Sequence, residues 1–350
     1  MMNKVKIIIL ILSSLLILIA VLFYLKIGWV MSGGVAIDGK RMGYCFDAAT
    51  DQNGNRLFVA AGIRGLHIFN LDAGKMSYIT TYYDDGYYRN LKMWEDWAFV
   101  ADTRRGLVVL NIREKLPETS WVQSNSTAMG LHIKENKAYV AASELGLQIF
   151  DISDPASPIL LSTTPTPGDA WDIWVNDDFA YIADLKAGMT VLDISSPDEP
   201  QIVKTVTWAK DYQMAEILRG EGNVVYIAAG KHGLIVIDVS DPTQPVLLSK
   251  YRPFRFGYAE GLAVKDGFVY LAMGSGIGSI STSENGLHII NASNPSSPEM
   301  VGKTSFLDWV EGVHTAGDFA YIANTWTGVR SIDIQNPDRP LLADTFNAFP

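Results

Sequence analysis

Gly146-Leu147-Gln148-Ile149-Phe150-Asp151-Ile152-Ser153-Asp154-Pro155 has the pattern of a buried β-strand followed by a turn that ends it. Nearly the same string returns as Gly233-Leu234-Ile235-Val236-Ile237-Asp238-Val239-Ser240-Asp241-Pro242. Weaker copies begin at Gly65, Gly106, Gly188, Gly286 and Gly328. Seven copies of one repeat therefore organise the chain.

The spacing inside the repeat is nearly constant. An Ala precedes the Gly of every copy, and the pairs are Ala60/Gly65, Ala101/Gly106, Ala141/Gly146, Ala183/Gly188, Ala228/Gly233, Ala272/Gly286 and Ala323/Gly328. Four residues separate the two in every copy except the sixth, where thirteen do. The copies recur about every 44 residues, which lies in the range of four-stranded propeller blades.

Strand signals fill each repeat. In the third copy, β-branched and aromatic residues between turn signals predict strands over Gly130–Lys134, Lys137–Ala142, Leu147–Ile152 and Ile159–Thr163. The second strand of every copy carries an aromatic residue at one place, namely Phe58, Phe99, Tyr139, Tyr181, Tyr226, Tyr270 and Tyr321. Such apolar strands are expected where stacked sheets cover both faces. We predict an all-β fold, a seven-bladed β-propeller of four-stranded antiparallel blades.

The closure of the ring has two solutions in the sequence. The last fourth strand, Leu341 to Phe346, can complete the seventh blade without strand exchange. Alternatively, Val35 to Asp38 contributes a strand from the other end of the chain.

The turn pattern carries a family resemblance. Gly-Leu-x-(Ile/Val)-x-Asp-(Ile/Val)-Ser-Asp-Pro-x-x-Pro, at 146–158 and 233–245, resembles the LVIVD repeat of bacterial and archaeal surface proteins, which is expected to form β-propellers. The resemblance covers roughly residues 43 to 350, although copies one and two carry Asn70-Leu71-Asp72-Ala73-Gly74 and Asn111-Ile112-Arg113-Glu114-Lys115 where the turn would stand. It implies no particular reaction and assigns no catalytic residue.

An apolar segment precedes the repeats. Ile7 to Leu25 is a run of 19 residues without a charge, so as a helix it nearly spans a hydrocarbon core. No small-x-small cleavage site follows it. We predict one N-terminal transmembrane helix within an uncleaved signal-anchor over residues 1–29, a spacer over 30–42 and the propeller over 43–350. Lys4 and Lys6 favour a cytoplasmic N-terminus and a single-pass protein whose propeller is extracytoplasmic, at the cell surface or in the periplasm.

Composition argues against several kinds of partner and cofactor. A formal charge of −10, a pI near 5.0 and the lack of a Lys/Arg-rich run argue against nucleic acid. A single cysteine, Cys45, excludes an internal disulfide and a multi-Cys zinc site. The repeated Asp and Ser are expected to satisfy N–H groups of the turns, because calcium needs more oxygen ligands. His132 and His314 fall on different blades, so we expect no convergence, no metal and no cofactor.

A candidate site follows from one position near the start of each first strand. Ten residues before the second-strand aromatics stand Arg89, Met129, Trp171, Glu216, Glu260 and Glu311. Asp47 is expected to fill the place in the first copy, so that blades five, six, seven and one form an acidic arc. Arg89, Met129 and Trp171 would face that arc, with Asp172 alongside. Connections between repeats add aromatic residues to the same face, Trp309 among them.

Several functions remain open for this face. The favoured interpretation is a binding module for a protein or glycan partner, with the long loop from Met273 to Asn285 as a contact element. For the carboxylates of the arc, a solvated rim or a structural network is the simplest interpretation, and a hydrolase using the arc and a structural part of an envelope assembly are the alternative functions. No residue is assigned a catalytic role, since neither Gly-x-Ser-x-Gly nor His-Glu-x-x-His occurs.

Overall fold

The computed structural model describes residues 36–37, 40–41, 44–114, 117–123, 126–210, 212–252, 257–274, 284–305, 310–324 and 328–347. The chain divides into two units, Met1–Gly43 and Tyr44–Pro350. In the first unit, β1 (Ala36–Ile37) pairs with β2 (Lys40–Arg41). The predicted transmembrane helix, at residues 1–29, lies outside the described residues. Among the segments that are described, none is a helix with the length and apolar character needed to span a bilayer.

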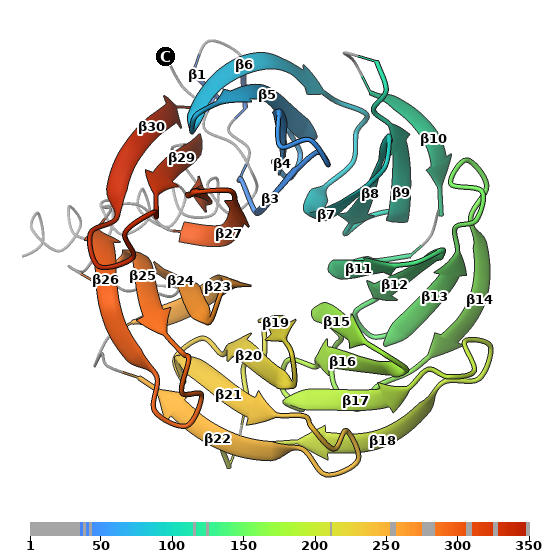
Figure 1. The fold of residues 1–350 in the computed structure, drawn as a ribbon. Coiled ribbons are helices and arrows are strands. Elements are labelled where there is room, and N and C mark those ends of the chain that lie inside the picture. The colour runs from blue at the N-terminus through green and yellow to red at the C-terminus, as the bar shows by residue number, and fades with distance from the viewer. Residues whose placement is uncertain are drawn as a thin grey trace, which may run out of the picture. The chain divides into compact units, whose positions relative to one another are not determined.

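The second unit is a ring of seven four-stranded sheets (Figure 1). Blade one contains β3 (Asp47–Thr50), β4 (Arg56–Ala60), β5 (Leu66–Asp72) and β6 (Lys75–Tyr82). Blade two contains β7 (Tyr88–Trp94), β8 (Trp97–Asp102), β9 (Gly106–Asn111) and β10 (Glu118–Val122). Blade three contains β11 (Gly130–Lys134), β12 (Lys137–Ala141), β13 (Leu147–Asp151) and β14 (Ile159–Thr164).

The remaining four blades follow in chain order. Blade four contains β15 (Asp172–Asn176), β16 (Phe179–Ala183), β17 (Met189–Asp193) and β18 (Gln201–Val206). Blade five contains β19 (Ile217–Glu221), β20 (Val224–Ala228), β21 (Leu234–Asp238) and β22 (Val246–Tyr251). Blade six contains β23 (Tyr258–Lys265), β24 (Phe268–Gly274), β25 (Gly286–Asn291) and β26 (Glu299–Ser305). Blade seven contains β27 (Val310–Ala316), β28 (Phe319–Asn324), β29 (Gly328–Asp333) and β30 (Leu341–Asn347).

Every blade is a meander in which consecutive strands pair antiparallel. The first strand of each blade lies nearest the centre of the ring, and the fourth forms its outer edge (Figure 1). This arrangement confirms the predicted architecture, and the third-copy strands agree with the structure to within one residue at each end.

The recurring Gly and Asp of the repeat have separate backbone roles. Gly146 has a φ of 76°, and a Cβ added there would lie 2.3 Å from the carbonyl oxygen of Thr164. Only glycine allows both the left-handed conformation and this close approach. The Asp151 side chain accepts a hydrogen bond from the Ser153 N–H at 2.8 Å, and Asp238 does the same for Ser240 at 2.8 Å. The repeated Asp is therefore a turn residue, as expected.

The hydrophobic core lies between neighbouring blades. In one cluster, Leu147 and Ile149 of blade three pack with Ile173 and Leu192 of blade four. Each of the other six interfaces around the ring has an equivalent cluster among the described residues. Burial of both faces of a sheet explains why the strands are almost continuously apolar.

The ring closes without strand exchange. Blade seven is completed by β30, whereas β1 pairs with β2 in a sheet of their own. The closing contact is made by side chains, because Phe346 of β30 stacks on Tyr78 of β6 with 5.4 Å between ring centres. Asp344 also accepts a hydrogen bond from the Met76 N–H at 2.7 Å. The first of the two predicted closures is therefore the one found.

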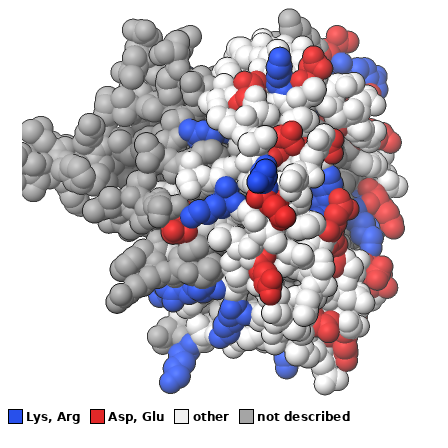
Figure 2. Space-filling model, turned by 60° about the vertical axis from the view of Figure 1, so that its left-hand side comes forward, with Lys and Arg blue, Asp and Glu red and all other residues white. Residues whose placement is uncertain are grey.

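Charges of both signs are spread over the outside of the ring. Figure 2 shows acidic and basic side chains interspersed, with uncharged residues between them, on the side that it draws. That side carries a mixed surface rather than a patch of one sign.

Candidate binding site at the channel mouth

Seven residues occupy one position at the start of the first strands, and we call them the mouth column: Phe46, Arg89, Met129, Trp171, Glu216, Glu260 and Glu311. The Trp171 N–H donates to the Ala183 carbonyl at 2.8 Å, and in blade one the equivalent bond runs from Phe46 to Ala60 at 2.9 Å. Asp47 pairs with Ala60 in the strand register and so stands one residue further along. Its predicted place in the column is wrong, because the β3–β4 turn absorbs two extra residues instead of one.

Three members of the mouth column sit at irregularities of their strands. The register shifts between Tyr88 and Asn90, between Ala259 and Gly261, and between Val310 and Gly312. The residues skipped by the ladder are Arg89, Glu260 and Glu311. A bulge re-aims the side chain of its extra residue and is frequent beside functional sites.

A small cavity lies where the mouth column meets the axis. Arg89, Met129, Glu216, Glu260 and Glu311 all line it, as do Phe46, Asp47 and Arg219. Its volume is about 30 Å³, which is roughly the share of liquid volume taken by one water molecule. We call it the mouth cavity. The structure thus brings together the one arginine and three glutamates that the sequence placed in this column.

Arg89 is held by aromatic rings. Its guanidinium carbon lies 4.5 Å from the ring centre of Trp171 and 5.7 Å from that of Phe46. The Phe46 ring lies 5.7 Å from Tyr87, which is in turn 5.5 Å from the guanidinium of Arg104. Cation–ring and ring–ring contacts therefore form one continuous series from the exposed Arg104 to Trp171.

Burial perturbs the acids of the mouth. It raises the pKa of Glu216 to about 7, although a hydrogen bond donated by the Tyr258 hydroxyl at 2.6 Å and the charge of Arg89 oppose the rise. Burial also raises the pKa of Glu311, again against the charge of Arg89. Carboxylates in such surroundings gain from any further cation, because desolvation penalises the ionised form.

Asp47 and Asp172 accept hydrogen bonds from neighbouring blades. Asp47 accepts hydrogen bonds from the Asn90 amide at 2.7 Å and the Leu91 N–H at 3.3 Å in blade two. The fully buried Asp172 accepts from the Leu218 N–H at 3.1 Å and forms an ion pair with Arg219, both in blade five. Both carboxylates therefore hold first strands together. Asp47 also lines the mouth cavity, and the part of both residues in a recognition surface stays a prediction.

Two parts of the predicted surface are not described. Trp309 and residues 275–283, which make up most of the long sixth-repeat loop, lie outside the described residues. Their place in the site stays a prediction.

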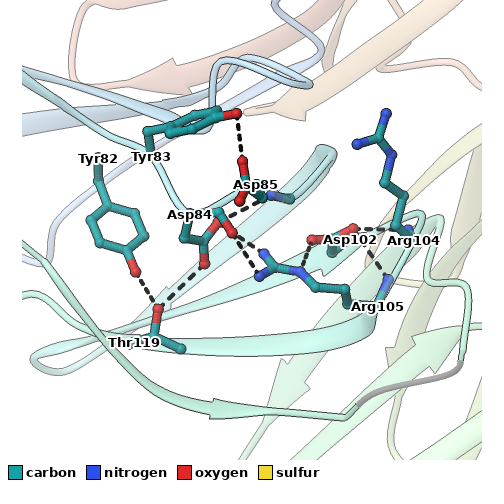
Figure 3. Close-up of polar contacts among 9 residues, drawn as sticks. Tyr82, Tyr83, Asp84, Asp85, Asp102, Arg104, Arg105 and Thr119 are labelled. Carbon is teal, nitrogen blue, oxygen red and sulfur yellow. Dashed lines mark hydrogen bonds and ion pairs between the residues drawn. The ribbon is translucent and has the colours of Figure 1, made fainter.

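Arg105, Asp84 and Asp102 form a charged clamp (Figure 3). Arg105 donates from Nε to Asp102 at 2.7 Å and from Nη2 to Asp84 at 2.9 Å. Asp102 is fully buried and also accepts from the Arg104 N–H at 2.8 Å. The clamp ties the connection between blades one and two to the β8–β9 turn, which carries Arg104.

Sequence reasoning missed Phe46 and the contact from Tyr258 to Glu216. It also expected His132 and His314 to stay apart, whereas both line a second cavity further along the channel. The two histidines hold the same position in their strands, because His132 pairs with Tyr139 and His314 pairs with Tyr321. This shared position is the sequence feature that could have indicated a common cavity. Within the described residues, no three or more His, Cys, Asp or Glu side chains are grouped to hold a metal ion.

Comparison with known families identifies the repeat. The LVIVD repeat model matches residues 85–131, 125–166, 167–207, 218–252, 256–305 and 310–348. These segments cover blades two to seven, and blade one, with its altered turn, lies outside them. No curated protein matches the chain.

Solved structures share the fold. The WD40 propeller domain of Doa1 is 10% identical, with 85% of this chain and 94% of that chain covered and a TM-score of 0.67. Sqt1 of Saccharomyces cerevisiae is 10% identical over 88% of this chain and 87% of that chain, with a TM-score of 0.64. The computationally designed Ika8 protein is 12% identical over 87% of each chain, with a TM-score of 0.62. At such identities the likeness concerns architecture alone.

Proposed function

The chain belongs to the LVIVD repeat family, and we propose that its propeller is a membrane-tethered, extracytoplasmic binding module whose mouth recognises a protein partner. The partner presents a cationic side chain to Glu216, Glu260 and Glu311. A propeller provides a rigid ring on which loops and first-strand ends form such a surface.

One observation carries this proposal. Among the described residues, neither Glu216 nor Glu311 has an ion-pair partner, although burial raises the pKa of both. The nearby Arg89 is held by Phe46 and Trp171 instead. A lysine or arginine of a partner would supply the missing positive charge in a poorly solvated place, where charge-assisted hydrogen bonds are strong.

Glycan binding and hydrolysis fit the mouth less well. Arg89 covers a face of Trp171, which a sugar ring would need for stacking. A cavity of about 30 Å³ holds a water molecule, whereas small-molecule sites are roughly ten times larger. We therefore favour recognition of a protein surface.

The mouth can be tested with a defined probe. A fluorescent tetralysine peptide is titrated against the full chain in detergent, and the triple variant Glu216→Gln/Glu260→Gln/Glu311→Gln is compared with wild type. We expect at least tenfold weaker binding by this variant. The matched control neutralises three exposed glutamates outside the mouth, Glu118→Gln/Glu199→Gln/Glu299→Gln, and should bind as wild type. Equal loss in both triples would reduce the effect to general electrostatics and overturn the proposal.

The tether and its orientation are supported by the sequence from Ile7 to Leu25 and by Lys4 and Lys6. The buried Cys45 leaves little background for labelling of a thiol introduced elsewhere. In intact cells, a membrane-impermeant maleimide should label Leu145→Cys, since Leu145 is exposed in the structure. Asn3→Cys should react only after the cells are permeabilised. The reverse pattern would place the propeller in the cytoplasm.

A second candidate, assembly with further copies of the chain, is favoured by a separate observation. Large apolar side chains are exposed on the outer strands of six blades, blades three to seven and blade one, among them Ile159 at 63%, Val246 at 56% and Leu341 at 65%. Exposed apolar residues that recur in this way are typical of contact surfaces. Chemical crosslinking of the full chain should give oligomers that Val246→Lys and Leu341→Lys abolish. If wild type and both variants remain monomers after crosslinking, the assembly proposal fails and the mouth remains the proposed site.

A further inference from the structure

A second and larger cavity lies in the channel. Its volume is about 420 Å³, and Lys92, His132, Trp174, Arg219 and His314 contribute to its lining. We call it the channel cavity. The channel cavity and the mouth cavity are neighbours. Three residues line both of them, namely Asp47, Arg219 and Val313.

The polar lining has one origin in the repeat. Lys92, His132, Trp174, Arg219 and His314 each pair with the second-strand aromatic of their own blade. Ala49 and Ala263 hold the equivalent places in blades one and six. Alternate residues of a strand face opposite sides of the sheet. The seven residues of this column hold the same register position, so each faces the same side of its own blade. Four of its seven members are basic residues or histidines.

The two cations of the channel cavity have more N–H donors than their described neighbours use. Lys92 donates to the Leu91 carbonyl at 3.2 Å and lies 3.7 Å from a carboxylate oxygen of Asp47. Arg219 donates to Asp172 and to the Leu218 carbonyl, in both cases from Nη1. Its Nε and Nη2 have no acceptor among the described residues. The lining therefore has a surplus of donors, and a complementary ligand is rich in acceptors.

The histidines add to this surplus. Nε2 of His314 accepts from the Thr50 N–H at 3.3 Å, so a neutral His314 carries its proton on Nδ1. His132 has no hydrogen bond to a described residue, and it is only partly buried. Burial lowers the pKa of His132 to about 3, helped by Lys92, Arg219 and Lys134. Burial lowers that of His314 to about 4, helped by Lys92 and Arg219 and opposed by Asp47. Both rings are neutral donors and acceptors at neutral pH.

We propose that the channel cavity is a binding site for a small oxyanion, a phosphate or a carboxylate, that accepts hydrogen bonds from Lys92, Arg219 and His132. Arginine and lysine are the side chains that recognise such groups, arginine through a planar fork and lysine as a point charge. The site adjoins the mouth cavity, with which it shares Asp47, Arg219 and Val313, and its ligand has the opposite charge to a cationic partner at the mouth. A partner at the mouth and an anion in the channel can therefore bind at the same time.

The test uses the full chain in detergent and isothermal titration calorimetry at constant ionic strength. Inorganic phosphate and succinate are titrated in separate arms, so the two sources of an oxyanion are distinguished. We expect saturable binding of at least one of them. Lys92→Gln and His132→Gln should each weaken it at least tenfold, while the mouth triple variant keeps wild-type affinity for the anion.

Two control variants guard against general effects. Lys134 lies on the same strand as His132 but donates to the Asp177 carbonyl outside the cavity, so Lys134→Gln removes a nearby charge without changing the lining. His232→Gln changes a histidine in an exposed loop. Both should bind the anion as wild type does, and melting curves check that all variants fold. The proposal is overturned if neither anion gives saturable heat, or if Lys92→Gln and His132→Gln bind as tightly as the controls.

Discussion

The guanidinium of Arg89 in blade two lies over the ring of Trp171 in blade four, 4.5 Å from its centre, and so reaches across the position of blade three. Blade three contributes Met129 to the mouth column, and this side chain is 8% exposed. Among the described residues, Arg89 forms this ring contact and no ion pair with Glu216 or Glu311.

Removing the Trp171 ring should change the mouth more than the fold. In Trp171→Leu, Arg89 loses a cation–π contact that is worth about 0.5–1 kcal/mol at a partly exposed site. The freed guanidinium can then approach Glu311 or Glu216 and compete with a cationic probe. We expect severalfold weaker tetralysine binding, measured by fluorescence anisotropy, with little change in the melting temperature. An unchanged affinity would show that the position of Arg89 has no influence on the mouth.

The pKa of Glu216 predicts a defined pH dependence. Because the folded pKa, about 7, is above the usual 4.5, the native state holds the proton more tightly, and stability falls as pH rises from about 4.5 to 7. Glu216→Gln keeps an acceptor for Tyr258 and removes the charge. Urea unfolding should show it roughly 3 kcal/mol more stable than wild type at pH 8, with little difference at pH 4. Glu299→Gln, at an exposed position, is the control and should follow wild type at both pH values.

Gly312 should be essential where the ring closes. A Cβ added there would lie 2.1 Å from the Phe46 carbonyl oxygen, so blades seven and one would have to separate. Gly312→Ala is expected to cost about 2–4 kcal/mol of unfolding free energy. Gly317→Ala, which meets nothing within 4 Å but has a φ of 53°, should cost only about 1 kcal/mol. Similar losses in the two variants would contradict the close approach of the blades.

The clamp of Figure 3 should contribute to stability because Asp102 is buried. Arg105→Met leaves that carboxylate without its cation and is expected to cost about 2–4 kcal/mol. The exposed pair of Arg113 and Asp96 provides the comparison, and Arg113→Met should cost less than about 0.5 kcal/mol. Thermal melts of both variants measure the difference. A small loss in Arg105→Met would mean that water satisfies Asp102.

The architecture could be read from the repeat because one physical pattern is written seven times. Each Gly–Asp–Pro unit fixes a strand and its turn through local backbone requirements, as Gly146 and Asp151 show. An error in one predicted strand end therefore does not alter the prediction for the other repeats. The column of Arg89, Glu216, Glu260 and Glu311 was found for the same reason, since a fixed spacing places equivalent residues together.

The site itself was predicted less well, because it depends on departures from the repeat. The β3–β4 turn holds two extra residues, so Phe46 and not Asp47 occupies the mouth column in blade one. Arg89 therefore contacts an aromatic ring there and not a carboxylate. Whether an acid faces the mouth or a neighbouring blade, as for Asp172, depends on contacts between segments far apart in sequence. His132 and His314 line one cavity because the blades close into a ring. Spacing along the chain gives no distance across the axis of that ring, so the sequence could not predict it.

The closure through β30 has a consequence for how this molecule can be rearranged. Every blade is one uninterrupted piece of chain, and Phe346 and Tyr78 join the last blade to the first through their side chains. Cutting the chain in any blade-to-blade connection separates no hydrogen-bonded strand pair. A circular permutant that starts at blade two and ends with blade one would keep all seven sheets intact, so the fold does not require the blades to follow one another from this starting point.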